Sequence, residues 1–272
     1  MRACGVQCDL VWEGPELNRQ NLQPRIEAAA AAGARLVALP EMWPTGFSMR
    51  PEVTAEPEGG ASERYLIDIA ASTGATLCGS VAQTRPWGGK ARNVFVLATP
   101  DGVVRRYAKI HPFRYGGEAE HYEAGDELPT WEVAGLRVTP MVCYDLRFPE
   151  LWALAAPRTD LFVVIANWPR PRAANWRALL VARAIETQAW VLGVNRVGQG
   201  GGLVYDGESA LVSPAGELQG DGFGPAGVER LVAGDVDPAA VAEVRRKFPF
   251  LADRRPEVYR RLRGEVPGRG ET

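Results

Sequence analysis

Residues 139–149 read Thr139-Pro140-Met141-Val142-Cys143-Tyr144-Asp145-Leu146-Arg147-Phe148-Pro149. They begin as an apolar strand that stops at a cysteine, and an apolar helical run follows at 150–156. Enzymes of the α/β class often place a nucleophile at such a point, because the strand is rigid and the turn after it exposes the sulfur. The alternative is that Cys143 is a small buried hydrophobic residue, as most free cysteines are. The groups at the ends of the other strands help to decide whether Cys143 is a nucleophile or a core residue.

The composition predicts an ordinary globular enzyme or binding protein, with 46% hydrophobic and 24% charged residues. A net charge of −2 gives no reason to expect nucleic acid or an anionic membrane as a partner. Four widely spaced cysteines and two histidines predict neither a metal site nor a disulfide framework. No signal peptide is evident and no apolar run approaches about 18 residues, so we expect a cytoplasmic protein.

The order of the predicted elements favours parallel strands with helices on the sheet faces. A strand at 3–7, a helix at 18–33 and an apolar strand at 35–40 form a β-α-β crossover. Two hairpins are expected, which pair 75–82 with 93–98 and 131–134 with 137–143. The remaining strands are predicted at 103–109, 161–166, 190–195 and 209–213, and the remaining helices at 62–72, 150–156, 176–188 and 238–247. Without a linker-like break, these elements predict one domain at 1–247 and a C-terminal arm at 248–272.

Three of the apolar strands end on groups of different chemistry, which are Glu41, Lys109 and Cys143. Taken singly, each has a plain structural explanation as a helix cap, a solvated charge or a core residue. Long charged side chains are almost never fully buried unless they are paired, so two of them at the ends of apolar strands predict a common cleft. A thiolate needs a base to form and a cation to persist, and a carboxylate and an ammonium group supply both.

These strand ends resemble the three signatures of the nitrilase superfamily, which are carbon–nitrogen hydrolases with a Glu-Lys-Cys triad. The matching stretches are Leu39-Pro40-Glu41-Met42, Tyr107-Ala108-Lys109-Ile110-His111 and Val142-Cys143-Tyr144-Asp145-Leu146-Arg147-Phe148-Pro149. The resemblance extends from residue 6 to about 253. Within the superfamily the chain is most similar to the omega-amidase branch, through the stretches 143–149, 166–169, 182–186, 195–198 and 247–249.

The resemblance implies a fold, an assembly and a mechanism. The fold is a four-layer α-β-β-α sandwich with the catalytic groups at one end of the sheets. The assembly is a homodimer at least, formed through helices on the outer face, with the C-terminal arm reaching across a partner. In the mechanism Glu41 is the general base for Cys143, and Lys109 and the backbone N–H of Tyr144 stabilise the oxyanion. No metal or organic cofactor is needed.

The superfamily also places a second glutamate in the loop after the lysine, a few residues before an aromatic residue and a glycine. Glu118, followed by Tyr122 and Gly125, fits this spacing, and Glu120 and Glu123 are close competitors. The sequence leaves the choice among the three acids open.

The omega-amidase branch implies hydrolysis of a 2-oxo acid amide, such as 2-oxoglutaramate or 2-oxosuccinamate, to a 2-oxo dicarboxylate and ammonia. A short anionic substrate calls for a fixed guanidinium, and Arg147 is the first candidate, with a salt bridge to Glu150 or another acid as its alternative role. Candidates for the pocket wall are the aromatic residues Trp168, Trp43, Phe47 and Tyr122. The competing functions are an amidase for deaminated glutathione or an N-carbamoyl amino acid, a nitrilase, and a non-catalytic scaffold of the same fold.

Overall fold

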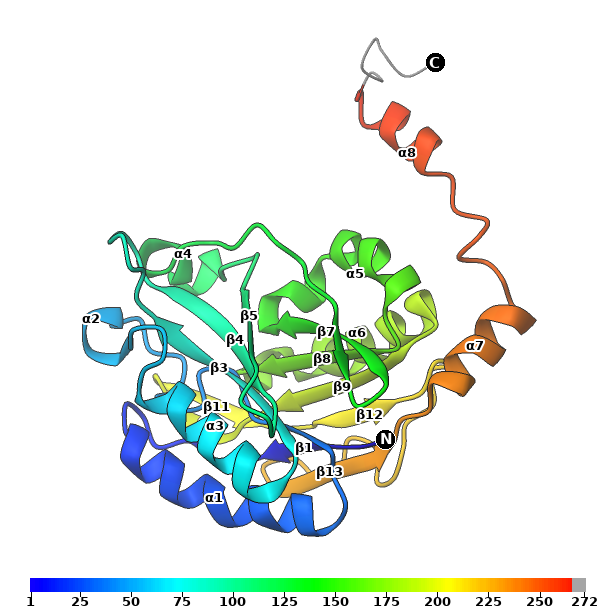
Figure 1. Ribbon diagram of the computed structural model, residues 1–272. Helices are drawn as coiled ribbons and strands as arrows, with labels where there is room; N and C mark the ends of the chain where they lie inside the picture. Colours follow the sequence, from blue (N-terminus) through cyan, green and yellow to red (C-terminus); the bar gives the residue numbers. More distant parts are fainter. Residues whose placement is uncertain (266–272) are drawn as a thin grey trace.

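The computed structural model describes residues 1–265, which form two facing sheets with helices on both outer faces (Figure 1). The first sheet has the strand order β13-β1-β2-β3-β4-β5 and the second β12-β9-β8-β7-β6. The helices α1 and α3 cover the first sheet, and α5 and α6 cover the second. This is the four-layer α-β-β-α sandwich that the sequence predicts.

The bounds of the elements agree with the predicted ranges to within a few residues. The first sheet contains β1 (Arg2–Gln7), β2 (Leu36–Ala38), β3 (Thr76–Gln83), β4 (Arg92–Ala98), β5 (Val104–Ala108) and β13 (Arg230–Asp235). The second sheet contains β6 (Trp131–Val133), β7 (Leu136–Val142), β8 (Leu161–Ala166), β9 (Trp190–Asn195) and β12 (Ala210–Val212). The longer helices are α1 (Pro15–Ala31), α3 (Ala61–Thr73), α5 (Pro149–Ala155), α6 (Ala173–Thr187) and α7 (Pro238–Lys247).

Strand pairing follows the β-α-β and hairpin predictions. The strands β1, β2 and β3 pair in parallel, and so do β7, β8 and β9. The predicted hairpins β3–β4 and β6–β7 are antiparallel. The strand β13, which pairs with β1 from the other end of the chain, was not predicted. As a half-exposed edge strand, β13 has only one buried residue and so lacks the apolar run that marks the central strands.

The outer layer of the first sheet shows why the helices form where they do. Helix α1 begins at Pro15, a residue preorganised for the first helical turn, and its buried face repeats at helical spacing through Leu22 and Ile26. Each of these two side chains contributes about 1.5–3 kcal/mol by burial. They pack against Cys4 and Cys8, which are in the core as predicted. Burial raises the pKa of the Cys4 thiol to about 11 and that of Cys8 to about 12, so both thiols stay protonated.

The inner layer is the contact between the two sheets, and it sets how closely the strand ends approach one another. Gly5 of β1 faces β9, where a Cβ atom on Gly5 would lie only 2.6 Å from Cγ2 of Val194. A larger residue at Gly5 would therefore push the sheets apart. Close packing of the sheets brings the ends of β2 and β5, from the first sheet, near the ends of β7 and β8, from the second.

The structure adds short elements that the sequence analysis treated as loops. The glycine-rich turn near residue 200 is a hairpin of β10 (Val197–Gly200) and β11 (Leu203–Asp206). The segment after Lys109 contains the helix α4 (Glu118–His121), and α2 (Pro51–Thr54) follows β2. Within residues 1–265 there are also four 3-10 turns, at Arg114–Gly116, Cys143–Arg147, Ala156–Arg158 and Arg170–Arg172. Three of these turns, at Arg114, at Cys143 and at Arg170, contribute residues to the wall of the candidate site.

The predicted C-terminal arm begins after α7 and contains α8 (Pro256–Leu262), which has no buried residue and stands away from the sandwich (Figure 1). Residues 266–272 of the predicted arm lie outside the described residues. Within 1–265, no helix is both long and apolar enough to cross a membrane. A cytoplasmic location stays a prediction.

Candidate active site

Cys143 lies immediately after the last residue of β7, at the start of the 3-10 turn Cys143–Arg147. Its backbone φ of 46° is in the left-handed region, which is strained for a residue with a side chain. This turn places Cys143 on the wall of a cavity of about 240 Å³. The first N–H groups of a helical turn have no partner within that turn, so we expect the backbone N–H of Tyr144, the next residue, to be available to a ligand.

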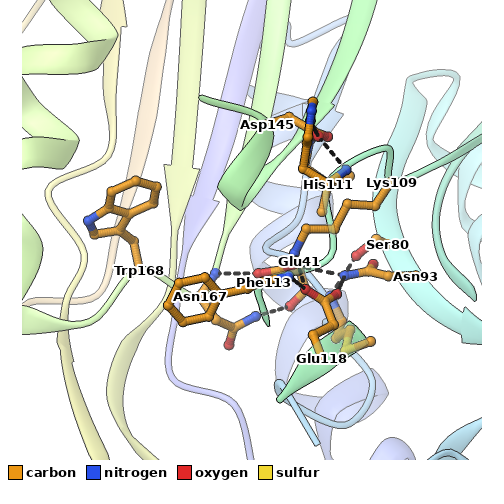
Figure 2. A network of polar contacts seen from close by, with 12 residues as sticks. Glu41, Ser80, Asn93, Lys109, His111, Phe113, Glu118, Asp145, Asn167 and Trp168 are labelled. Carbon is orange, nitrogen blue, oxygen red and sulfur yellow. Dashed lines mark hydrogen bonds and ion pairs between the residues drawn. The ribbon is translucent and has the colours of Figure 1, made fainter. Parts of the chain in front are cut away.

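The buried carboxylate of Asp145 holds this turn against the end of β5. It accepts hydrogen bonds from the backbone N–H of Val142 at 3.1 Å, the hydroxyl of Tyr107 at 2.7 Å and the backbone N–H of His111 at 3.0 Å. Nδ1 of His111 also lies 3.0 Å from Oδ1 of Asp145 (Figure 2). His111 therefore fixes its loop by hydrogen bonding, and Asp145 ties the strand that ends at Cys143 to the strand that ends at Lys109.

Replacing Asp145 with Ala is expected to destabilise the fold by about 3 kcal/mol or more, because each buried donor left without an acceptor costs about 1–3 kcal/mol. Urea unfolding monitored by tryptophan fluorescence measures this change. The exposed Asp126 provides a control, and Asp126→Ala should change stability by about 0.5 kcal/mol at most. A loss below about 1 kcal/mol for Asp145→Ala would contradict the structural role of this carboxylate.

Lys109 lies at the centre of a buried network of charges. Its Nζ donates to Oε1 of Glu41 at 2.9 Å and to Oε2 of Glu118 at 2.7 Å, and all three side chains are at most 1% exposed. Asn93 on β4 completes the network, since its Nδ2 donates to Glu41 at 2.8 Å and to Glu118 at 3.1 Å (Figure 2). The structure thus brings the two carboxylates and the ammonium group together, as the strand ends predict.

The same network distinguishes Glu118 from its two competitors. Glu123 forms ion pairs with Arg85 and Arg92, away from Lys109. Glu120 is exposed. Of the three acids, only Glu118 points to the buried lysine, and it also accepts the backbone N–H of Phe113 at 2.5 Å.

Burial and the neighbouring charges both shift the pKa values of these groups. Burial alone would lower the pKa of Lys109, but the carboxylates of Glu118 and Glu41 outweigh it and raise this pKa. Burial, reinforced by the charge of Glu41, raises the pKa of the Cys143 thiol well above its ordinary value, against the opposing effect of Lys109. Burial also raises the pKa of Glu118. At neutral pH the resting sulfur is therefore a protonated thiol that needs a base when it reacts.

Asn167, at the end of β8, fixes the carboxylate of Glu41 from the second sheet. Its backbone N–H donates to Oε2 of Glu41 at 2.9 Å, and its Nδ2 donates to the backbone oxygen of Glu41 at 2.6 Å (Figure 2). This leaves Oδ1 of Asn167 buried and, within residues 1–265, without a hydrogen-bond partner. Asn167 also lines the cavity. Asn167 lies in the stretch 166–169 that resembles the omega-amidase branch, but no role was predicted for it.

Three of the predicted substrate-binding residues, Arg147, Trp168 and Phe47, line the cavity with Cys143. The guanidinium of Arg147 stacks over the Trp168 ring, with 4.8 Å from Cζ to the ring centroid, and donates to Oδ1 of Asn175 at 3.2 Å. The alternative role of Arg147, a salt bridge to Glu150, is not found in the described part of the chain.

The predictions that Trp43 and Tyr122 line the pocket are wrong. Trp43 is fully buried in the outer core, 5.4 Å from the ring centroid of Tyr65, because the backbone turns directly after Glu41. Tyr122 is also buried and donates its hydroxyl to the backbone oxygen of Ser48 at 2.8 Å. It belongs to a small buried cluster against which Phe47 packs, and it is not among the residues that line the cavity in the described part of the chain. A sequence pattern places an aromatic residue in a loop but does not tell which way its ring points.

Other residues on the cavity wall were not predicted at all. They share no motif and come from five separate segments, namely Trp12, Met49, Phe113, Arg172, Leu203 and Tyr205. For Arg172 a weak signal existed, because it ends the stretch Pro169-Arg170-Pro171-Arg172 just after the matched residues 166–169.

Known proteins resemble this chain in both sequence and fold. A family model described as carbon-nitrogen hydrolase matches residues 2–246. The chain belongs to the carbon–nitrogen hydrolase family. The omega-amidase YafV of Yersinia enterocolitica is 42% identical to this hydrolase over 215 residues, which are 79% of this chain and 82% of that protein. The 2-oxoglutaramate amidase of Bacillus subtilis (strain 168) is 29% identical over 259 residues, 93% and 97% of the two chains.

A solved structure supports the same assignment for this carbon–nitrogen hydrolase. XC1258 from Xanthomonas campestris, a CN-hydrolase superfamily protein, superposes with a TM-score of 0.87 at 37% identity and covers 94% of this chain and 97% of its own. The resemblance to the nitrilase superfamily is confirmed, as is the sandwich fold. The protein is a hydrolase that acts on carbon–nitrogen bonds of amides.

Proposed function

We propose that this hydrolase is an omega-amidase, which releases ammonia from the terminal amide of a short 2-oxo acid such as 2-oxoglutaramate or 2-oxosuccinamate. The observation that carries the proposal is the buried Lys109 held between Glu41 and Glu118, with Glu41 hydrogen-bonded to Asn167, which lines one small cavity together with Cys143 and Arg147. The relatives named omega-amidase and 2-oxoglutaramate amidase support the choice of substrate class.

The first half of the reaction forms a thioester. Glu41 takes the proton from the Cys143 thiol while the sulfur attacks the amide carbon, so a carbon–sulfur bond forms and the carbonyl electrons move to the oxygen. Lys109 and the backbone N–H of Tyr144 stabilise the oxyanion, and one such donor is worth roughly 3 kcal/mol. Glu41 then passes the proton to the amide nitrogen, the carbon–nitrogen bond breaks, and ammonia leaves.

The second half hydrolyses the thioester. Glu41 or Glu118 takes a proton from a water molecule, which attacks the thioester carbon. The carbon–sulfur bond breaks, the sulfur regains a proton and the dicarboxylate departs. Glu118 has a second task, because with Glu41 it holds the Lys109 ammonium in place and charged.

The shape and charge of the cavity favour a short anionic substrate. A volume of about 240 Å³ lies below the range of roughly 300–1,000 Å³ that is typical of pockets for drug-sized ligands. Arg147 supplies a fixed cation on the wall, and a guanidinium binds a carboxylate through two parallel hydrogen bonds. A nitrile usually has no carboxylate for Arg147 to bind, which argues against a nitrilase.

The test is a comparison of kcat/KM among candidate substrates, measured as ammonia release. We expect the highest value for 2-oxoglutaramate or 2-oxosuccinamate. A higher value for deaminated glutathione or an N-carbamoyl amino acid would assign the protein to another branch of the family. No turnover of any of these, with a Cys143 thiol that is labelled no faster than a denatured-state cysteine, would favour a non-catalytic scaffold.

We also propose that residues 1–247 form the catalytic domain and that the arm from residue 248 contacts a second subunit in a homodimer. The described part of the arm exposes the apolar residues Phe248, Phe250, Tyr259 and Leu262. Exposed apolar groups on a projecting segment favour a contact with another chain. Light scattering on the full chain and on a chain ending at residue 247 tests this. A monomeric full chain would contradict the dimer, and an unchanged dimer after truncation would contradict the role of the arm.

A further inference from the structure

Arg172 was not predicted from sequence, yet it reaches the same cavity as Cys143 and Arg147. It is the last residue of the 3-10 turn Arg170–Arg172, between β8 and α6. Its backbone oxygen accepts a hydrogen bond of 2.7 Å from Nε1 of Trp168, whose ring lies under Arg147. The turn that carries Arg172 is thus fastened to the same tryptophan that positions Arg147.

The arginines next to Arg172 are all paired with acids. Arg170, in the same turn, binds Asp206 at 2.7 Å, and Arg177 binds Glu208 at 2.5 Å. For Arg172, by contrast, the part of the chain that the structure describes offers no acid within 4.0 Å and no hydrogen-bond acceptor for the guanidinium. A guanidinium carries five N–H donors, so the whole donor set of Arg172 remains for a ligand.

Both cavity arginines are held by aromatic rings and not by carboxylates. Arg172 lies over the Phe113 ring at 5.1 Å, and Arg147 lies over the Trp168 ring at 4.8 Å. Stacking on a ring face orients a guanidinium and leaves the N–H groups at its edge free to bind. The two groups are therefore placed before a ligand arrives, which lowers the entropy lost on binding.

The charged side chains among the described lining residues of the cavity are all positive. Arg147 and Arg172 both line it, and among its described lining residues there is no aspartate or glutamate. Two like charges in one small cavity repel each other, and an anion between them removes this cost. The cavity wall is thus complementary to a negatively charged group on the ligand.

We propose that Arg172 is a second specificity-determining residue, which binds the carboxylate end of the substrate together with Arg147. The inference rests on the proposed function and refines it. A 2-oxo acid presents two carboxylate oxygens and an adjacent oxo oxygen in one plane. A single guanidinium binds two of these oxygens, so the second guanidinium accounts for recognition of the third. A neutral amide gains nothing from either arginine.

Kinetics on a matched pair of amides test the proposal. In the Arg172→Gln variant, kcat/KM for anionic 2-oxoglutaramate should fall roughly 10- to 100-fold, mainly through KM, because hydrogen bonds to a charged group are lost. The value for neutral pentanamide should not change. The kcat/KM of Arg172→Lys for 2-oxoglutaramate should lie between those of the wild type and Arg172→Gln, since an ammonium keeps the charge but loses the planar fork.

The control is Arg170→Gln in the same turn, which should leave the ratio of kcat/KM between the two amides unchanged. An equal effect of Arg172→Gln on both amides would overturn the proposal.

Binding of the dicarboxylate 2-oxoglutarate separates this inference from the proposed function, because it needs no turnover. Titration calorimetry should show binding to the wild type and roughly 10- to 100-fold weaker binding to Arg172→Gln. Equal affinity, or no binding to the wild type, would overturn the role of Arg172. If the wild type prefers a different amide, the proposed function fails, while weaker binding of 2-oxoglutarate by the variant would still support the anion site.

Discussion

Cys143→Ala is expected to lower kcat for 2-oxoglutaramate by about 10⁴-fold or more, because the variant has no atom that can form the thioester. The other cysteines cannot take over. Cys78 is fully buried in the core, and burial raises the pKa of its thiol. Ammonia release measures the loss, and mass spectrometry after an acid quench should detect the acylated protein in the wild type alone.

The fold of this variant should remain intact. Cys143 adopts a strained backbone with φ of 46°, and alanine is small enough to occupy its place. Cys78→Ala is the matched control, which should lose some stability through the cavity it creates and keep its activity. Ammonia release by Cys143→Ala above about one per cent of the wild-type rate would show that another group is the nucleophile.

Lys109→Met is expected to lose both activity and stability. Activity falls because the oxyanion loses its charged donor, an effect of about 10²–10³-fold or more. Stability falls because Glu41 and Glu118 stay buried without their cation, and breaking a buried ion pair in this way costs about 3–5 kcal/mol. Urea unfolding measures the second effect.

The loss of stability in Lys109→Met should depend on pH in a definite direction. Burial already raises the pKa of Glu118 above 4.5, and removing Lys109 removes the charge that opposes this shift. A carboxyl whose pKa is raised in the folded state favours folding at low pH, and this stability is lost as the pH rises through the folded pKa. The variant should therefore be closest to wild type near pH 5 and weakest at pH 8.

A second substitution provides the control for this prediction. In Lys109→Met/Glu118→Gln one buried carboxyl becomes a neutral amide, so stability at pH 8 should recover in part while activity does not. Equal destabilisation of Lys109→Met at pH 5 and pH 8 would contradict the assignment of the loss to a buried carboxylate.

The sequence predicted the groups that lie at the ends of strands and did not predict those positioned by loops. Glu41, Lys109 and Cys143 could be found because each follows a predicted strand, and the topology brings the ends of these strands together. Glu118 could not be separated from Glu120 and Glu123, since its selection depends on contacts formed only in the folded chain.

The wrong and the missing predictions have the same origin, namely turns and contacts that form only in the folded chain. Trp43 immediately follows a strand end, but the strained backbone at Met42, with φ of 44°, accompanies a turn that buries its ring away from the cavity. Asn167 and Arg172 were missed because the role of an amide or of a surface-type arginine, even one beside a matched stretch, becomes clear only when its partners, or the absence of partners among residues 1–265, are seen.

The catalytic groups come from both sheets, and this has a consequence for how activity appears during synthesis of the chain. Glu41 and Lys109 follow strands of the first sheet, whereas Cys143 and Asn167 follow strands of the second, and Asn167 reaches Glu41 across 126 residues of sequence. The first sheet is complete only when β13, near the end of the chain, pairs with β1. A nascent chain that has not yet reached β13 therefore contains all four groups but lacks the edge strand that completes the first sheet, so we expect activity to appear late in folding.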